Sequence, residues 1–197
     1  MKAVYEQREA ERRNRNEPTN KVDATDCLHN VRVVFSPNFD ERPAECAISL
    51  LVIHNISLPP EVFSGDGVVE FFTNKLDPEA HPYYQTLRGL QVSTHFFIRR
   101  DGETIQFVPC EKRAWHAGES CWQGRSRCND FSIGIELEGS DTTPFTDTQY
   151  QALAALTRAL QKTYPITDIV GHSDIAPGRK TDPGPCFDWD RYRTALA

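Results

Sequence analysis

The sequence predicts a single α/β domain, in which α-helices flank a central mixed β-sheet. A nearly continuous apolar run at residues 48–55 has the length of a strand buried on both faces. Apolar and polar residues alternate over residues 132–139, and an apolar repeat of helical spacing follows over residues 150–160. The chain has 197 residues, which favours one domain that buries its core without disulfides or a structural metal.

The first half of the chain supplies a tail and the first core elements. Residues 1–24 are rich in charge and form a predicted tail, whereas residues 25–197 form the predicted domain. Residues 25–48 are polar and contain prolines, so we expect them to wrap over the surface of the domain. The run at 48–55 is the first core strand, and residues 67–75 have apolar positions suited to a short helix.

The second half carries stronger local signals. The pair Asp101-Gly102 separates two apolar segments and predicts a β-hairpin. Thr146 and Gln149 have the spacing of a capping box that opens a helix, and Pro165 ends that helix. The other predicted elements are strands at residues 132–139 and 168–172 and a final helix at residues 188–196.

Composition excludes several classes of function. The chain has 22 Lys and Arg against 28 Asp and Glu, a net charge of −6, so it lacks an overall positive field for nucleic acid. No segment approaches the roughly 20 apolar residues that span a membrane. The charged first residues do not resemble a secretory signal. The six cysteines contain no Cys-x-x-Cys pair and read as reduced thiols. We therefore expect a cytoplasmic protein with no nucleic-acid or membrane partner.

Two of the histidines stand at the ends of predicted strands, where ligand sites gather in α/β sheets. His54 ends the first core strand, and His172 ends the strand at 168–172. Two neutral imidazoles and one carboxylate can form a zinc site that keeps an open position. Asp174 and Asp182 are both candidates for the carboxylate. Because these residues are far apart in the sequence, the pattern alone leaves a purely structural role open for each histidine.

Other polar residues allow two interpretations each. Glu136 lies in the middle of an apolar strand, and it either points to solvent or lies in a cleft as a general base. Arg179 and Lys180 lie in a loop rich in Pro and Gly, where such charges are usually solvated. Beside a metal, however, the lysine ammonium can stabilise a developing oxyanion.

A group of cationic and aromatic residues lies between the hairpin and the strand at 132–139. It comprises Arg125, Arg127, Trp115, Trp122 and His116. Aromatic rings stack on sugars, and guanidinium groups bind carboxylates through two hydrogen bonds, so the group suits a ligand that has both. The alternative is an ordinary surface loop.

Several long segments resemble one family closely. They are LLVIHNISLPP, AHPYY, VSTHFFIRRDGETIQFVPCEKRAWHAG, GRSRCNDFSIGIELEG and GHSDIAPGRKTDPGPCFDW. These segments are similar to the cytosolic anhydromuramyl-peptide amidases, a branch of the zinc-dependent N-acetylmuramoyl-L-alanine amidase superfamily. Phage-type amidases and peptidoglycan recognition proteins are related to that branch in fold. The resemblance runs from about Val33 to Tyr192.

The resemblance implies an assignment of the site. His54, His172 and Asp182 would bind Zn²⁺, Glu136 would be the catalytic glutamate, and Lys180 would be the catalytic lysine. The substrate contacts implied by similarity are Asn55, Trp115, Arg127, Ala176 and Arg179.

The implied reaction is hydrolysis of the amide between the lactyl group of (1,6-anhydro-)N-acetylmuramic acid and L-alanine, in peptidoglycan recycling. Muropeptides are the implied substrates, no protein partner is implied, and by analogy the reaction lowers the signal for β-lactamase induction. The sequence departs from the family at Gln91, where Arg is common, and at Gly178, where Glu is common. Phage-type relatives use a cysteine as third ligand, and Cys186 lies close by, but the motif places Asp182 there.

Three alternatives stay open. A binding module of the peptidoglycan-recognition type would hold muropeptides without cleaving them, although the complete set of candidate ligands and catalytic residues argues against it. A cysteine hydrolase would use Cys110, Cys128 or Cys186 with a histidine, and spacing does not exclude it. An envelope amidase would act on intact peptidoglycan, and the charged first residues count against that location.

Overall fold

The computed structural model describes residues 31–197. These residues form a six-stranded sheet with the order β1-β5-β4-β9-β3-β10 and two small sheets, β2-β6 and β7-β8. The strands are β1 (Val31–Val33), β2 (Phe39–Glu41), β3 (Leu50–Ile56), β4 (Phe96–Ile98), β5 (Thr104–Gln106), β6 (Lys112–Ala114), β7 (Cys121–Trp122), β8 (Arg125–Ser126), β9 (Ser132–Glu138) and β10 (Asp168–Gly171). The helices are α2 (Gly67–Phe72), α3 (Pro82–Gln85), α4 (Asp147–Thr163), α5 (His172–Ile175), α6 (Trp189–Leu196) and the 3-10 helix η2 (Cys128–Asp130).

The middle of the main sheet is parallel. Strand β3 lies between β9 and β10 and runs parallel to both, and β4 runs parallel to β9 on its other side. Strands β4 and β5 form the antiparallel hairpin that the Asp101-Gly102 pair predicts. The sheet is therefore mixed, as predicted, and the carboxyl ends of β9, β3 and β10 meet at one edge.

Helix α4 begins and ends where the sequence predicts. The Gln149 N–H donates to Thr146 Oγ1 at 3.1 Å, and the Thr146 N–H donates to Gln149 Oε1 at 3.0 Å, so the capping box is formed. The helix ends at Thr163, because Tyr164 precedes Pro165 and is extended.

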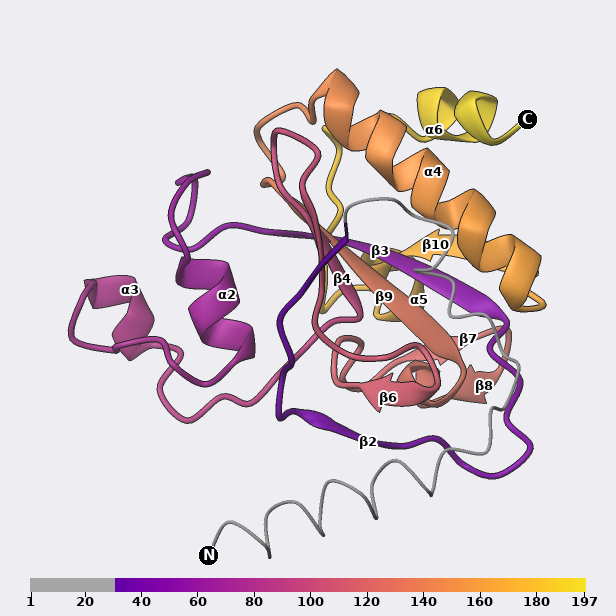
Figure 1. Cartoon of the computed structure of the whole chain (residues 1–197), viewed down its shortest axis with the longest axis horizontal. Coiled ribbons are helices and arrows are strands. Elements are labelled where there is room, and N and C mark those ends of the chain that lie inside the picture. The colour runs from indigo at the N-terminus through magenta and orange to yellow at the C-terminus, as the bar shows by residue number, and fades with distance from the viewer. Residues whose placement is uncertain (1–30) are drawn as a thin grey trace, which may run out of the picture.

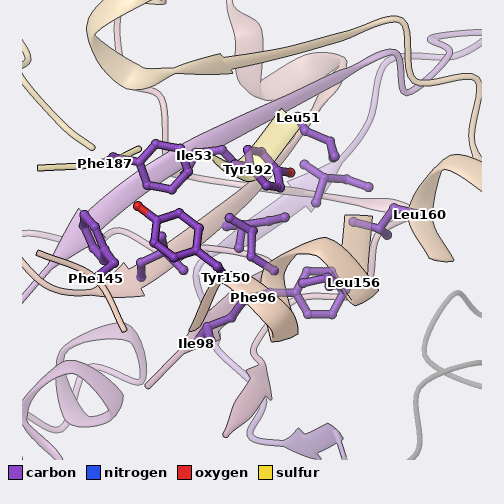
Figure 2. Packing of buried hydrophobic residues seen from close by; sticks show 14 of the residues in the cluster. Leu51, Ile53, Phe96, Ile98, Phe145, Tyr150, Leu156, Leu160, Phe187 and Tyr192 are labelled. Carbon is purple, nitrogen blue, oxygen red and sulfur yellow. The ribbon is translucent and has the colours of Figure 1, made fainter. Parts of the chain in front are cut away.

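One face of the sheet is covered by α4 and α6 (Figure 1). Leu51 and Ile53 of β3 and Ile133 and Ile135 of β9 point toward these helices, and Figure 2 shows how the side chains of the core interlock. The other buried members include Phe96, Ile98, Leu137, Phe145, Tyr150, Leu153, Leu156, Leu160, Phe187 and Tyr192. Each such side chain stabilises the fold by about 1.5–3 kcal/mol on full burial, so this cluster holds the strands of the site in place.

The opposite face carries the alternate residues of the strands. Leu50 and Val52 of β3 pack with Val170 in a second apolar cluster, and the apolar side of α2 covers another part of this face. His54 follows Leu50 and Val52 with the same period of two, and Glu136 of β9 is its partner across the strand pair. The face thus changes from apolar to buried polar side chains toward the carboxyl ends of the strands.

The structure differs from the sequence prediction in several places, two of which concern the sheets. Within residues 31–48, part of the predicted surface lead-in, β1 pairs with β5 and β2 pairs with β6, so two segments of the lead-in belong to sheets. All seven residues of β9 are buried, so its polar positions do not face solvent. The predicted tail at residues 1–24 lies outside the described residues. Among residues 31–197, no helix is both long and apolar enough to cross a membrane.

Candidate metal centre and active site

The pairing of β3 with β10 brings two histidines together. Ile53 is the register partner of Gly171, so His54 and His172 follow side by side at the carboxyl ends of parallel strands. Their Nδ1 atoms lie 3.0 Å apart. Asp182 comes from the loop after α5, and its Oδ2 atom lies 2.9 Å from His54 Nδ1 and 3.1 Å from His172 Nδ1. The three side chains form a group that can hold a metal ion.

The outer nitrogen of each histidine also has a partner. His172 Nε2 lies 3.1 Å from the carbonyl oxygen of Ala117. A carbonyl only accepts hydrogen bonds, so this contact places the proton of His172 on Nε2 and leaves the Nδ1 lone pair facing Asp182. His54 Nε2 lies 3.0 Å from His116 Nδ1, so the same Nδ1-inward orientation occurs in both candidate ligands.

The protonation states of the group suit a cation. Burial lowers the pKa of His54 to about 4, which leaves the imidazole neutral at pH 7. Burial alone would raise the pKa of Asp182, but hydrogen bonds to His172 and His54 outweigh it and hold the pKa below its usual value. Nitrogen lone pairs and an ionised carboxylate therefore converge on one point, and these are the forms that bind metals.

Of the two candidate carboxylates, only Asp182 joins the histidines. Asp174 Oδ2 instead accepts a hydrogen bond of 2.7 Å from the Gly171 N–H at the start of α5. The Asp182 loop is held from both sides, because the Ser173 N–H donates to the Asp182 carbonyl at 2.9 Å. Asn55 Nδ2 donates to the carbonyl of Pro183, the next residue, at 3.0 Å.

Glu136 lies next to this group on β9 and is 8% exposed. Its register partner on β3 is His54. Its Oε2 atom is buried and has no hydrogen-bond partner among the described residues. Burial raises the pKa of Glu136 well above its ordinary value, the nearby Asp182 charge raises it further, and Lys180 opposes both. The solvent-facing interpretation of Glu136 is therefore wrong.

The metal group and Glu136 line one cleft of about 670 Å³. The lining has a polar part that includes Arg179, Lys180 and Trp115. Its apolar residues come from the end of β3, from α2 and α3 and from the loops around these helices, and they include Ile56, Leu58, Phe71, Phe72, Tyr83, Leu87, Leu90 and Val92. A cleft of this size with a few convergent polar groups is typical of a small-ligand site.

The structure separates the five expected substrate contacts. Asn55, Trp115 and Arg179 line the cleft, whereas Arg127 and Ala176 are not among its lining residues. Arg127 forms an ion pair with Asp130, with 3.1 Å between Nε and Oδ2, and 70% of the Arg127 side chain is exposed. Ala176 is buried, and its carbonyl accepts the N–H groups of residues 179 and 180, which shapes the loop that carries those cations.

The cationic and aromatic group does not assemble as one surface. The guanidinium carbon of Arg125 lies 3.8 Å from the centroid of the Phe131 ring. Trp115 Nε1 donates to Asp40 at 2.7 Å, whereas His116 lies in the interior against His54. None of the described cysteines lines the cleft, so the structure gives no support to the cysteine hydrolase.

Several residues that shape the site were not expected from the sequence. Arg42 donates to the carbonyls of Asn129, Asp130 and Ser132 and so holds the start of β9. Asn129 Oδ1 in turn accepts the N–H groups of residues 116 and 117. Arg42 and Asn129 both bind backbone groups, and such contacts produce no recognisable sequence motif. The one sequence signal for Asn129 is its position shortly before an apolar strand.

Comparison with known proteins assigns the chain to a class. The model of the N-acetylmuramoyl-L-alanine amidase family matches residues 44–185, which include all three candidate metal ligands and Glu136. The chain therefore belongs to the N-acetylmuramoyl-L-alanine amidase family.

Within that family, the chain is similar to amidases that act on anhydromuramyl peptides. The chain is 57% identical to the 1,6-anhydro-N-acetylmuramyl-L-alanine amidase AmpD of Escherichia coli strain K12 over 172 residues, 86% of this chain and 94% of the relative. A crystal structure of selenomethionine AmpD aligns with a TM-score of 0.84 at 57% identity, covering 86% of this chain and 96% of the other. The amidase AmiD from E. coli, solved with anhydro-N-acetylmuramic acid-L-Ala-D-γ-Glu-L-Lys, aligns with a TM-score of 0.56 at 33% identity, covering 78% and 60%.

Proposed function

We propose that this chain hydrolyses the amide between the lactyl group of 1,6-anhydro-N-acetylmuramic acid and L-alanine in muropeptides, as a step of peptidoglycan recycling. The observation that carries the proposal is the convergence of three candidate metal ligands and a buried carboxylate in one cleft. The 57% identity to AmpD across 86% of the chain supports the substrate class. A relative that binds an anhydromuramyl peptide in the same fold supports it further.

The candidate ligands fit Zn²⁺. Two imidazole nitrogens and one carboxylate are a set found in catalytic zinc sites, which keep a fourth position open. Zinc–ligand distances of about 2.0–2.2 Å put tetrahedral ligand atoms roughly 3.3–3.5 Å apart. The corresponding distances here are 3.0, 2.9 and 3.1 Å, slightly shorter. Bound at His54, His172 and Asp182, Zn²⁺ would polarise the scissile carbonyl and lower the pKa of a water.

Glu136 is the proposed general base. Its carboxylate takes a proton from the attacking water while the water oxygen bonds to the carbonyl carbon. It then passes that proton to the alanine nitrogen as the C–N bond breaks. The products are a lactyl carboxylate and a peptide with a free amino group. The raised pKa of Glu136 helps it to hold the proton between these two transfers.

Cations and polar groups around the cleft complete the proposed mechanism. Lys180 stabilises the negative charge that develops on the carbonyl oxygen, because an ammonium near a developing oxyanion lowers the barrier. Asn55, Trp115 and Arg179 line the cleft and are the proposed substrate contacts. Arg127 and Ala176 stay in the proposal only through the family motif. A cytoplasmic location also stays a prediction, supported by the cysteine pattern.

The direct test is peptide release from purified 1,6-anhydro-N-acetylmuramyl tripeptide, followed by mass spectrometry. We expect the zinc-loaded protein to release the tripeptide with L-alanine at its amino end, and a chelator to stop the release. Tight binding of the same ligand without any release would overturn the hydrolase and favour a recognition module. Release that persists after complete removal of metal would overturn the zinc mechanism and leave the substrate assignment standing.

A further inference from the structure

We propose that His116 and Ser132 are positioning residues that fix the tautomer of His54 and thereby set the metal affinity of the centre. The inference deepens the proposed zinc amidase function and rests on it. His116 was grouped with surface aromatics by sequence position, but it is 9% exposed and lies under the metal group. Its ring meets the ring of His54 edge-on, with centroids 5.1 Å apart.

A chain of hydrogen bonds leads from the metal group into the core. His54 Nε2 lies 3.0 Å from His116 Nδ1, and His116 Nε2 lies 3.1 Å from Ser132 Oγ. A neutral imidazole carries one donor and one acceptor, so all bonds of the chain must run in the same direction. If His116 Nε2–H donates to the serine, His116 Nδ1 accepts from His54 Nε2–H, and His54 Nδ1 keeps a bare lone pair toward Asp182.

The opposite direction would block the centre. If Ser132 donates to His116, then His116 Nδ1–H donates to His54, and His54 must carry its proton on Nδ1. That proton would point at Asp182 Oδ2, 2.9 Å away, and would occupy the lone pair that a metal requires. A cation in the group therefore selects the direction that ends at Ser132 Oγ. An acceptor that fixes the tautomer of a metal-binding histidine also strengthens its ligand nitrogen.

Both histidines are supported by the same two-residue segment. The side chain of His116 contacts the outer nitrogen of His54, and the carbonyl of Ala117 accepts from the outer nitrogen of His172. Asn129 Oδ1 fixes this segment by accepting the N–H groups of residue 116 at 3.2 Å and residue 117 at 2.8 Å. One short segment therefore orients two ligands that are distant in the sequence.

The fit of the His116 ring is close on the side of β9. A Cβ atom at Gly134 would lie 2.5 Å from Cγ of His116, which real structures do not tolerate. Glycine at this position therefore lets the imidazole lie flat against the strand, between Ser132 and His54. Packing against Gly134 therefore restricts the orientation of the His116 ring, as expected for a side chain whose orientation matters for a site.

The experiment measures zinc itself, by competition with a chromophoric chelator at constant pH, in four variants of the full chain. In His116→Leu the acceptor is lost, and we expect zinc affinity to fall about 10–100-fold, the range typical for outer partners of metal ligands. In His116→Asn the side-chain oxygen takes roughly the place of Nδ1, so most of the affinity should return. In Ser132→Ala we expect zinc affinity to fall about tenfold. Thr157→Val removes another buried, hydrogen-bonded hydroxyl, which contacts Tyr192, and should change stability without changing zinc affinity.

A second readout separates positioning from a general loss of structure. Long-range ¹H–¹⁵N NMR of the zinc-loaded wild-type protein should show the His54 proton on Nε2. In zinc-loaded Ser132→Ala the hydrogen bond from His54 Nε2–H to His116 should be weaker, which we expect to see as an upfield shift of that proton. Wild-type affinity in Ser132→Ala, or in a folded His116→Leu, would overturn the inference. If the wild-type protein itself binds no zinc, the proposed zinc function is wrong. This outcome can be told apart from failure of the positioning role, because no variant would then differ from the wild type in zinc binding.

Discussion

His54 and Glu136 occupy the same register position on neighbouring parallel strands, β3 and β9. One is a candidate metal ligand, and the other is a buried carboxylate with an oxygen that lacks a partner in the described part of the chain. Such burial costs stability, so an unpaired buried carboxylate oxygen in a native fold points to a functional role. The strand pairing therefore sets the spacing between ligand and base directly, without any intervening loop.

Replacing Glu136 by Gln tests its role as base. We expect peptide release to slow about 10²–10⁴-fold, the usual contribution of a general base, while zinc content stays unchanged, because Glu136 is not in the ligand group. Steady-state turnover and zinc content measured on the same sample check this. The variant should also be more stable than the wild type in urea, because a neutral amide replaces a carboxylate whose charge burial disfavours. Undiminished turnover would show that another group takes the proton.

Asp182 and Asp174 offer a matched pair of substitutions. In Asp182→Asn the ligand charge is lost, and zinc affinity should fall by more than the roughly 100-fold seen for outer partners of metal ligands. In Asp174→Asn the acceptor for Gly171 N–H loses its charge, which should lower the free energy of unfolding by about 1 kcal/mol and leave zinc stoichiometry at its wild-type value. Equilibrium dialysis with zinc and urea unfolding measure the two effects. Equal losses of zinc would mean that the ligand assignment is wrong.

Gly134→Ala should disturb the centre without removing any polar group. The added methyl meets the His116 ring, so the ring must move, and we expect a loss of stability of about 1–3 kcal/mol from overpacking together with weaker zinc binding. Gly67→Ala is the control, because its Cβ would meet the Leu58 carbonyl oxygen at 2.5 Å, at the start of α2 rather than beside His116. Thermal unfolding and chelator competition on both variants should show two destabilised proteins, of which only Gly134→Ala has lost zinc affinity.

His95 should make the metal-free protein sensitive to acid. Burial, followed by the Arg42 charge, lowers the pKa of His95 to about 3, against about 6.5 in an unfolded chain. Between these values only the unfolded state binds the proton, so the free energy of unfolding falls as the pH drops from about 6.5 toward 3.

The variant His95→Asn isolates this contribution. Its side-chain oxygen can still accept the Gly134 N–H, which donates to His95 Nδ1 at 3.0 Å. Urea unfolding at pH 6, 5 and 4 should give a slope that is shallower than the wild-type slope by up to about 1.4 kcal/mol per pH unit. Parallel pH profiles for the two proteins would show that His95 is protonated in the folded state.

Much of the fold and the ligand set could be predicted from the sequence because the signals are local. Strand β3 is an apolar run, α4 begins with a capping box, and an Asp-Gly pair makes the hairpin turn. His54 and His172 could be singled out because each stands at the end of such a strand. The choice of Asp182 over Asp174 came from the family motif, and in the structure Asp182 lies beside the histidines whereas Asp174 accepts a backbone N–H.

The remainder depends on contacts between distant segments. No pattern in β9 indicates that its polar face is covered, because His116, which covers part of it, comes from a separate segment of the chain. Arg42 lies in a segment that reads as a surface lead-in, yet its guanidinium reaches the carbonyls before β9. Hydrogen bonds to backbone carbonyls need no particular partner residue, so they are invisible to any motif.

The pairing of β3 with the edge strand β10 has a consequence for how the protein is made. His54 and His172 are separated by 118 positions, so a ribosome delivers His54 well before the other two candidate ligands, His172 and Asp182. Until β10 emerges, one edge of β3 stays unpaired, and its residues are apolar. An open apolar strand edge promotes aggregation of incomplete chains. The three candidate metal ligands can therefore come together only after the segment that carries His172 and Asp182 has been made.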